Sequence, residues 1–217
     1  MSPPPSLPET RYVARTAAKI LERNTRSLSC CVFGSLACNL HGTSRKPNDV
    51  DLLVTGGGQD MEQLKQLLVD CDDRFYLVPS KVPGATHKKL YFRLPGRNRS
   101  CKVDILHEGI MELPPIPRRR MIKKFHGVPA MPLSALLLTK LKGWCDHRES
   151  SRSDAYEKEC NDVEDISELL QMNVWIPRGV LWLRQSLLEA SKERVQEYVH
   201  VHPETYDLWE KTGYNAC

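Results

Sequence analysis

The sequence predicts an α+β fold, in which a small mixed β-sheet with flanking helices is followed by a C-terminal helical domain. Short apolar runs separated by turn residues fill the first half of the chain, as expected for strands. In the second half apolar residues recur with the helical period, most clearly between Pro132 and Trp144. The proline-rich residues 114–117 mark the change between the two patterns.

At 217 residues the chain has room for one large domain or two small ones. We expect four segments. They are a flexible lead at residues 1–8, an α/β core at 9–113, a linker at 114–130 and a helical domain at 131–217. A cleft between the core and the helical domain is the expected place for a ligand.

In the first half, Asp60 is a candidate N-cap, because an Asp before an apolar periodic run satisfies free N–H groups of the first turn. Helices are expected at 9–25, 35–40 and 60–68. Strands are expected at 28–33, 50–54, 74–78, 90–94 and 101–106, the last two as a hairpin across Pro95–Asn98.

In the second half, periodic apolar residues predict helices at 132–144 and 161–172 and a third helix from Pro177 to Leu187. Two short helices are expected at 193–199 and 203–211. The polar segment 147–159 is expected to be a loop.

The most informative local pattern joins a Gly-Ser turn to two carboxylates. The apolar run ending at Phe33 leads into Gly34-Ser35, and Asp49 and Asp51 follow on a second apolar run. Side chains two apart on a strand point to the same face, so both carboxylates aim at one point. Converging carboxylates beside a glycine turn suit divalent metal binding and phosphoryl chemistry.

This pattern resembles the signature of the nucleotidyltransferase superfamily that includes DNA polymerase beta. The resemblance covers roughly residues 28–107, with Asp104 in an apolar alternation as the third carboxylate of the family. It implies that Asp49, Asp51 and Asp104 are the catalytic metal ligands, for two Mg²⁺ ions or for Mn²⁺ in their place. It also implies that Gly34 and Ser35 bind the phosphates of a nucleoside triphosphate. Taken as a bare strand-to-helix turn, Ser35 would be an N-cap only.

The helical half resembles the later motifs of AbiEii-type nucleotidyltransferases, a minimal branch of the same superfamily. Those motifs pair a helical Lys with a downstream basic-Asp-x-x-Asp element. Lys140 and Asp162 occupy the matching positions, with Asn161 in place of the basic residue. The resemblance implies that Lys140 reaches the triphosphate and that Asp162 orients it.

Composition narrows the setting. A 41% hydrophobic and 27% charged sequence is typical of a globular protein, and no apolar run approaches the roughly 18 residues of a membrane span. The eight cysteines show no zinc-binding spacing, which favours a reducing, cytoplasmic location. A net charge of +4 permits RNA or tRNA as a partner without requiring it.

The basic residues of the sequence do not identify the acceptor of the reaction. Arg97, Arg99, Lys102 and Arg118–Arg120 form a solvated face or guide a polyanionic acceptor, and Arg45 and Lys46 belong to a solvated loop or touch phosphates. We therefore expect a magnesium-dependent nucleotidyltransferase acting on RNA, protein or a small molecule. The alternatives are a catalytically silent nucleotide-binding module on the same fold and a protein-interaction role for the helical half.

Overall fold

The chain divides into two compact units in the computed structural model. The structure describes residues 3–56, 58–81, 84, 86–116, 122–172, 174–176, 183 and 185–214. The first unit comprises residues 1–40 and 46–131, and the second comprises residues 41–45 and 132–217. The second unit therefore takes a five-residue segment from inside the predicted α/β core, as well as the predicted helical region.

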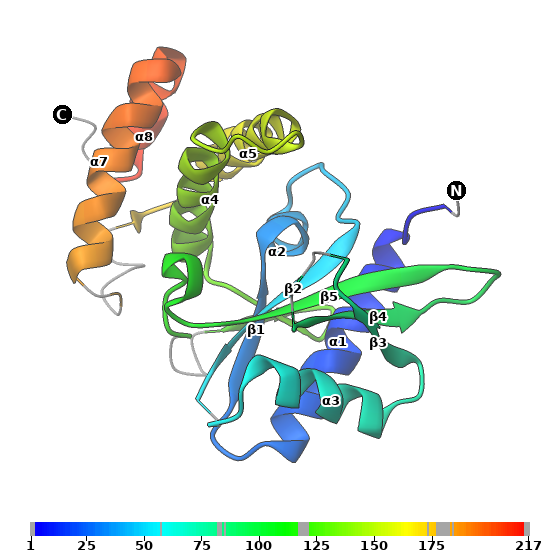
Figure 1. Cartoon of the computed structure of the whole chain (residues 1–217). Helices are drawn as coiled ribbons and strands as arrows, with labels where there is room; N and C mark the ends of the chain where they lie inside the picture. Colours follow the sequence, from blue (N-terminus) through cyan, green and yellow to red (C-terminus); the bar gives the residue numbers. More distant parts are fainter. Residues whose placement is uncertain are drawn as a thin grey trace. The chain divides into compact units, whose positions relative to one another are not determined.

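The first unit is built on a seven-stranded mixed sheet with the strand order β3-β4-β5-β2-β1-β7-β6 (Figure 1). Its strands are β1 (Ser29–Phe33), β2 (Asp49–Thr55), β3 (Phe75–Pro79), β4 (Lys88–Arg93), β5 (Ser100–His107), β6 (Lys123–Phe125) and β7 (Val128–Ala130). The β2–β5 and β1–β7 pairs are parallel, and the remaining pairs are antiparallel. The predicted mixed sheet and the predicted β4–β5 hairpin are confirmed.

Two helices cover one face of this sheet, α1 (Leu7–Asn24) and α3 (Met61–Cys71) (Figure 1). Both begin with a capping box: Ser6 pairs with Glu9, and Asp60 pairs with Gln63, whose backbone N–H donates to the Asp60 side chain. α1 begins at Leu7, two residues inside the predicted lead, and the predicted cap at Asp60 is confirmed.

Alternate residues of the central strands supply the core under these helices. Val50 and Leu52 of β2 and Val103 and Ile105 of β5 are almost completely buried. Because side chains alternate across a strand, Asp49, Asp51 and Asp104 face the other side of the sheet. The hydrophobic face of the sheet therefore fixes which way the carboxylates point.

The structure differs from the linker predicted at 114–130, because about the last half of that segment belongs to the sheet. Residues 123–125 and 128–130 form the β6–β7 hairpin, and β7 pairs in parallel with β1 at Val32. The signal was too short to read: β6 has three residues, two of them lysines, and His126 and Gly127 make a tight turn with positive φ.

The second unit is helical. Its elements are α4 (Leu133–Arg148), α5 (Ala155–Leu170), α7 (Gln185–Val201), the 3₁₀ turn η3 (Pro203–Thr205) and α8 (Tyr206–Lys211). α4 packs along α5, and α7 also contacts α4. Trp144 on α4 forms edge-to-face contacts with Tyr198 of α7 and with His202, which follows the end of α7. No helix among the described residues has both the length and the apolar character needed to cross a membrane.

Two boundaries in this unit differ from prediction. The expected loop at 147–159 is only six residues long, because α4 continues to Arg148 and α5 starts at Ala155. The helix expected at 193–199 is part of the longer α7. The first turns of the helix expected from Pro177 fall at residues 177–182, outside the described part of the chain. The first turn of α5 was not predicted, because the residues after Ala155 are Tyr156 and charged side chains that lie at the surface.

Candidate metal centre

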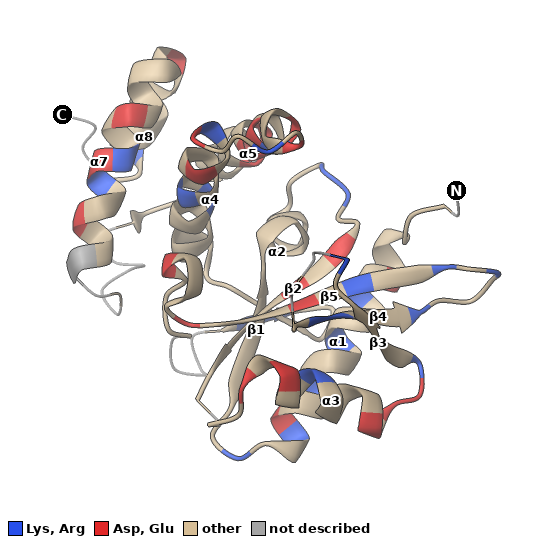
Figure 2. Cartoon of the chain, in the orientation of Figure 1, with Lys and Arg blue, Asp and Glu red and all other residues tan. Residues whose placement is uncertain are grey.

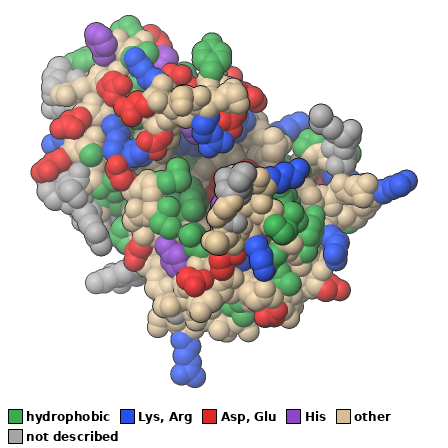
Figure 3. All heavy atoms as spheres, in the orientation of Figure 1, with side chains coloured by type: hydrophobic (Ala, Val, Ile, Leu, Met, Phe, Trp, Pro, Cys, Tyr) green, Lys and Arg blue, Asp and Glu red, His purple; other side chains and the backbone are tan. Residues whose placement is uncertain are grey.

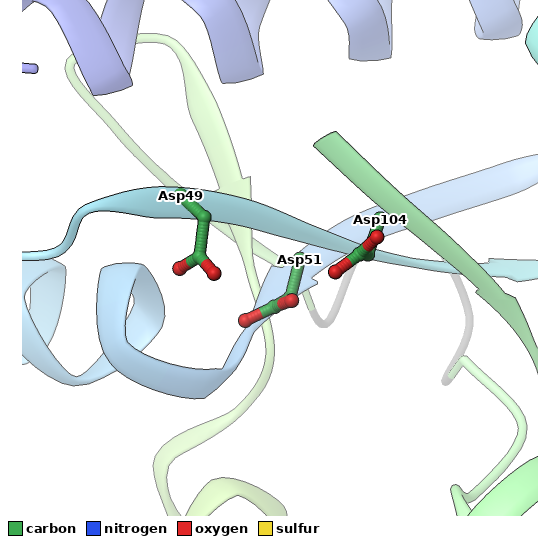
Figure 4. Close-up of side chains that lie close together, drawn as sticks. All are labelled: Asp49, Asp51 and Asp104. Carbon is green, nitrogen blue, oxygen red and sulfur yellow. The ribbon is translucent and has the colours of Figure 1, made fainter. Parts of the chain in front are cut away.

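Three carboxylates meet on the open face of the central strands. Asp51 and Asp104 are direct partners across the parallel β2–β5 ladder, and Asp49 precedes Asp51 by two residues on the same strand. One oxygen from each carboxylate can be chosen so that the three lie within 4.8 Å of one another. Figure 4 shows the three side chains next to one another along β2 and β5. All three are partly exposed, so a ligand from solvent can reach them.

The Gly-Ser turn lies directly against this cluster. β1 pairs antiparallel with β2, and Phe33 is the register partner of Asp51. Gly34, the next residue after Phe33, therefore lies beside the Asp51 carboxylate. Gly34 has φ of 63°, and a Cβ placed on it would lie 2.5 Å from Asp51 Oδ2. A side chain at this position would therefore strain the backbone and displace the carboxylate. The absence of a side chain on Gly34 therefore leaves room for Asp51, and contact of Gly34 with a phosphate stays a prediction.

Ser35 lies in the first turn of α2 (Gly34–His41) and is largely buried, with 8% of its surface exposed. Because α2 starts at Gly34, Ser35 sits inside the first turn and not at the predicted cap position. The N–H groups of a first helical turn have no partner within the helix and carry partial positive charge. This turn therefore suits an anion, and contact of Ser35 with a triphosphate stays a prediction.

Lys102 lies beside the carboxylates. It precedes Asp104 by two residues on β5, is the ladder partner of Asp49, and forms an ion pair with Asp104. Burial lowers the pKa of Lys102, but its hydrogen bond to Asp104 and the charges of Asp49 and Asp51 outweigh this and raise it. The ammonium group is therefore held positive by the cluster.

The negative potential also reaches Cys101, the neighbouring residue on the opposite face of β5. Burial and, to a smaller degree, the charges of Asp49, Glu9 and Asp51 raise the pKa of the Cys101 thiol to about 12. The three carboxylates bring negative charge together at one partly exposed place on the sheet. Partly exposed carboxylate oxygens are the ligands that Mg²⁺ and Mn²⁺ prefer, so the cluster fits a divalent metal ion.

The second unit contains a different charged cluster around Lys140 of α4. Its Nζ lies 3.0 Å from Asp162 Oδ1 and 2.7 Å from Asp165 Oδ2, both on α5. Lys140 is 9% exposed, Asp162 5% and Asp165 1%, so this network is buried. The predicted pairing of Lys140 with Asp162 is observed. Contact of Lys140 with a phosphate stays a prediction.

Further side chains of the second unit complete this cluster. The Arg45 guanidinium binds both oxygens of Asp165, and Nδ1 of His147 lies 2.7 Å from Asp162 Oδ2. Ser44 adds a hydrogen bond of 2.7 Å from its backbone N–H to Glu168. These contacts fasten residues 44–45 to α5. Arg45 was expected in a solvated loop or at a phosphate, and the structure pairs it with a buried carboxylate.

Lys102, Asp165 and His147 belong to these clusters, and no role in them was predicted for these residues from the sequence. The available signal was spacing: Lys102 is two residues before Asp104 on a strand, and Asp165 is one helical turn after Asp162. His147 had no such signal, because its partner is fifteen residues away on another helix.

The basic residues expected to guide an acceptor fall into separate environments. Arg99 is bonded to Glu9, with N–O distances of 2.7 and 2.8 Å, and Lys102 belongs to the metal centre. Arg97 is exposed at the tip of the β4–β5 hairpin. Arg118–Arg120 lie outside the described residues.

Comparison with known proteins gives a match in structure. The chain matches no protein-family model and none of the curated proteins. Among solved structures it resembles an antigenic nucleotidyltransferase-like protein from Paracoccidioides brasiliensis, with a TM-score of 0.69 and 16% identity, over 98% of this chain and 96% of that one. A cytoplasmic RNA terminal U-transferase aligns over 79% of this chain and 49% of its own length, with 14% identity and a TM-score of only 0.34.

The chain therefore has a nucleotidyltransferase-like fold, shared over nearly its whole length with the fungal protein. The α+β class expected from the sequence is confirmed. The acidic cluster and the glycine turn described above lie in the sheet of this fold.

Proposed function

We propose that the chain is a metal-dependent nucleotidyltransferase, which moves a nucleoside monophosphate from a nucleoside triphosphate to a hydroxyl group of an acceptor. The observation that carries the proposal is the convergence of Asp49, Asp51 and Asp104 within 4.8 Å on two adjacent strands, against the turn at Gly34. The nucleotidyltransferase-like fold supports it.

The reaction forms a bond between the acceptor oxygen and the α-phosphorus and breaks the bond from that phosphorus to pyrophosphate. Mg²⁺, held by the three carboxylates, would neutralise the charge that develops on the phosphates. The turn at Gly34–Ser35 would orient the triphosphate through backbone N–H groups. Asp104, fixed by its ion pair with Lys102, would hold the acceptor hydroxyl and take up its proton.

Membership of the AbiEii-like branch is a finer part of the same proposal. It is supported by the burial of Lys140 with Asp162 and by Asp165 at the second acidic position of the Asp-x-x-Asp element. Asn161, which stands at the basic position, uses its side chain to donate a hydrogen bond to the Glu157 carbonyl 2.8 Å away. In this branch Lys140 would act on the triphosphate, and RNA, a protein or a small molecule would be the acceptor.

The direct test is pyrophosphate release and transfer of label. The full chain is incubated with each of the four α-labelled ribonucleoside triphosphates and MgCl₂, with and without tRNA and total RNA. We expect label to appear on the acceptor or on the protein, and the label to vanish with EDTA and in Asp51→Asn. Two results together would contradict the proposal: wild-type transfer that continues in EDTA, and transfer by Asp51→Asn at the wild-type rate.

A catalytically silent nucleotide-binding module is the second candidate, and the ion pair between Lys102 and Asp104 favours it. An ammonium group on a metal-ligating carboxylate satisfies part of its charge without a metal ion. A titration with Mn²⁺, monitored by electron paramagnetic resonance, distinguishes the enzyme from the silent module. Nucleotide binding without bound Mn²⁺ and without pyrophosphate release supports the silent module.

A further inference from the structure

The face of the sheet that carries the carboxylates continues beyond them as a row of aromatic and basic side chains. Ladder partners share a face of a sheet. Asp49 of β2 pairs with Lys102 of β5, Lys102 pairs with Tyr91 of β4, and Tyr91 pairs with Tyr76 of β3. These four side chains therefore form one row across four strands, from the metal centre to the sheet edge.

The outer half of this row is built for stacking. The rings of Tyr76 and Tyr91 are stacked, with centroids 5.8 Å apart and an interplanar angle of 25°. The guanidinium carbon of Arg93, two residues after Tyr91, lies 5.1 Å from the centroid of the Tyr76 ring. Both rings are partly exposed and Arg93 is exposed, whereas Phe75 and Phe92 on the other face are buried. A core role accounts for the phenylalanines but leaves the surface rings without one.

Basic side chains share this face with the tyrosines. Lys89 and Arg93 alternate with Tyr91 on β4, and Lys102 of the metal centre is the ladder partner of Tyr91. Figure 2 shows Lys and Arg along the β4–β5 hairpin, and Figure 3 shows hydrophobic side chains next to basic ones over the same region. Tyrosine rings interleaved with cations match the chemistry of single-stranded nucleic acid, whose bases stack on aromatic faces and whose phosphates pair with cations.

We propose that Tyr76, Tyr91 and Arg93, with Lys89, form a platform for a single-stranded nucleic acid that leads its end to the metal centre. The proposal names the acceptor class and so rests on the proposed function. Neighbouring strands are about 4.8 Å apart, so the platform extends about 10 Å from β5 to β3. That length suits a chain of nucleotides and exceeds one base. In a duplex the bases are stacked on one another, so they cannot stack on the tyrosine rings.

Fluorescence anisotropy tests the platform without depending on turnover. Labelled single strands of RNA and of DNA, each about 12 nucleotides long, are titrated with the full chain in EDTA at low salt, a length within the range that one single-strand-binding module occupies. We expect Tyr91→Leu and Tyr76→Leu to weaken binding about 5- to 100-fold, because each removes a stacking face. Tyr91→Phe keeps the ring and should keep the affinity.

Controls separate stacking from charge and from folding. Tyr156→Leu removes a tyrosine that is 78% exposed on α5 and should change nothing. Arg93→Gln, a surface change that leaves the core intact, should weaken binding and reduce the salt slope by about one. Inorganic polyphosphate, which has charge but no bases, should bind wild type and Tyr91→Leu equally.

The outcomes distinguish this platform from the proposed function. Asp51→Asn should abolish transfer and keep oligonucleotide binding. Binding that depends on Tyr91 with no transfer by wild type would support the platform and contradict the proposed function. Transfer with single-strand binding unaffected by Tyr91→Leu, Tyr76→Leu and Arg93→Gln would overturn the platform and leave the function standing. No binding of either single strand at low salt would also overturn it.

Discussion

The carboxylates of the two units are arranged in opposite ways. In the first unit Asp49, Asp51 and Asp104 are partly exposed, and Asp104 forms an ion pair with Lys102. In the second unit Asp162 and Asp165 are buried and bonded to cationic side chains of the protein itself.

Burial explains this difference. A buried carboxylate without a partner costs several kcal/mol, so the second cluster has to carry its own cations to fold. A partly exposed cluster has a smaller desolvation cost, because water still reaches its carboxylates. Carboxylates gathered at an accessible position therefore suit a ligand site, and ion pairs in the interior suit a structural role. Four substitutions test this contrast, from the largest expected effect to the smallest.

Asp51→Asn should lower nucleotidyl transfer at least about a hundredfold, because a lost metal ligand removes several kcal/mol of transition-state stabilisation. The melting temperature measured without metal should not fall, since one of three repelling charges is removed. Asp73→Asn, at an exposed position of the same unit, is the matched control and should leave both quantities unchanged. A large loss of stability in Asp51→Asn would show that this cluster stabilises the fold, as the cluster of the second unit does.

Lys140→Met should destabilise the fold by about 3 kcal/mol, because Asp162 and Asp165 would keep buried charge with fewer partners. Lys142→Met, which removes an i,i+4 pair with the partly exposed Asp146, should cost less than about 1 kcal/mol. Urea unfolding measures both. Triphosphate affinity of the two variants then tests the predicted phosphate contact: equal, small changes in affinity would limit Lys140 to a structural role.

Lys102→Met should raise Mn²⁺ affinity about tenfold, since it removes an ammonium group that competes with the metal for Asp104 and that repels it. Isothermal titration calorimetry gives this value directly, with Lys124→Met on the short strand β6 as a control. Unchanged or weaker Mn²⁺ binding would show that Lys102 supports the ligands more than it competes with the ion.

Glu9→Gln should have the smallest effect. Hydrogen bonds from Arg99, then from the backbone and side chain of Ser6, lower the pKa of Glu9 to about 2. A lowered folded-state pKa contributes stability that is present above the unfolded value of 4.5 and is lost as pH falls towards 2. Because the pair is largely solvated, the loss should be below about 1 kcal/mol, seen as a flatter stability profile of the variant in that window.

The sequence predicted the parts of the fold that depend on local pattern. The strands around Val32, Leu52 and Val103, and the capped helix after Asp60, have clear periodicity and are found where expected. The strands at 123–130 were not predicted, because they are short and because β7 pairs with β1, a contact that local sequence does not indicate. The alternation of Asp49 and Asp51 with Val50 likewise sufficed to predict which carboxylates share a face.

Neighbours that come from distant segments were beyond such reasoning. Arg45 meets Asp165 across 120 residues of sequence, and the stack of Tyr76 on Tyr91 depends on the register of β3 against β4. Register is fixed by the burial of the opposite face, including Phe75 and Phe92, once the sheet has formed. Local sequence supplies the side chains of these contacts, and tertiary pairing decides which of them meet.

The close approach of Gly34 to Asp51 bears on how such a motif tolerates insertions and deletions. The two residues meet because β1 and β2 are hydrogen-bonded with Phe33 opposite Asp51, and not because a given number of residues separates them. The segment between the two strands could therefore be lengthened or shortened without moving the carboxylate, whereas any side chain at position 34 would push it away. Strand pairing, and not linear spacing, is what this half of the motif preserves.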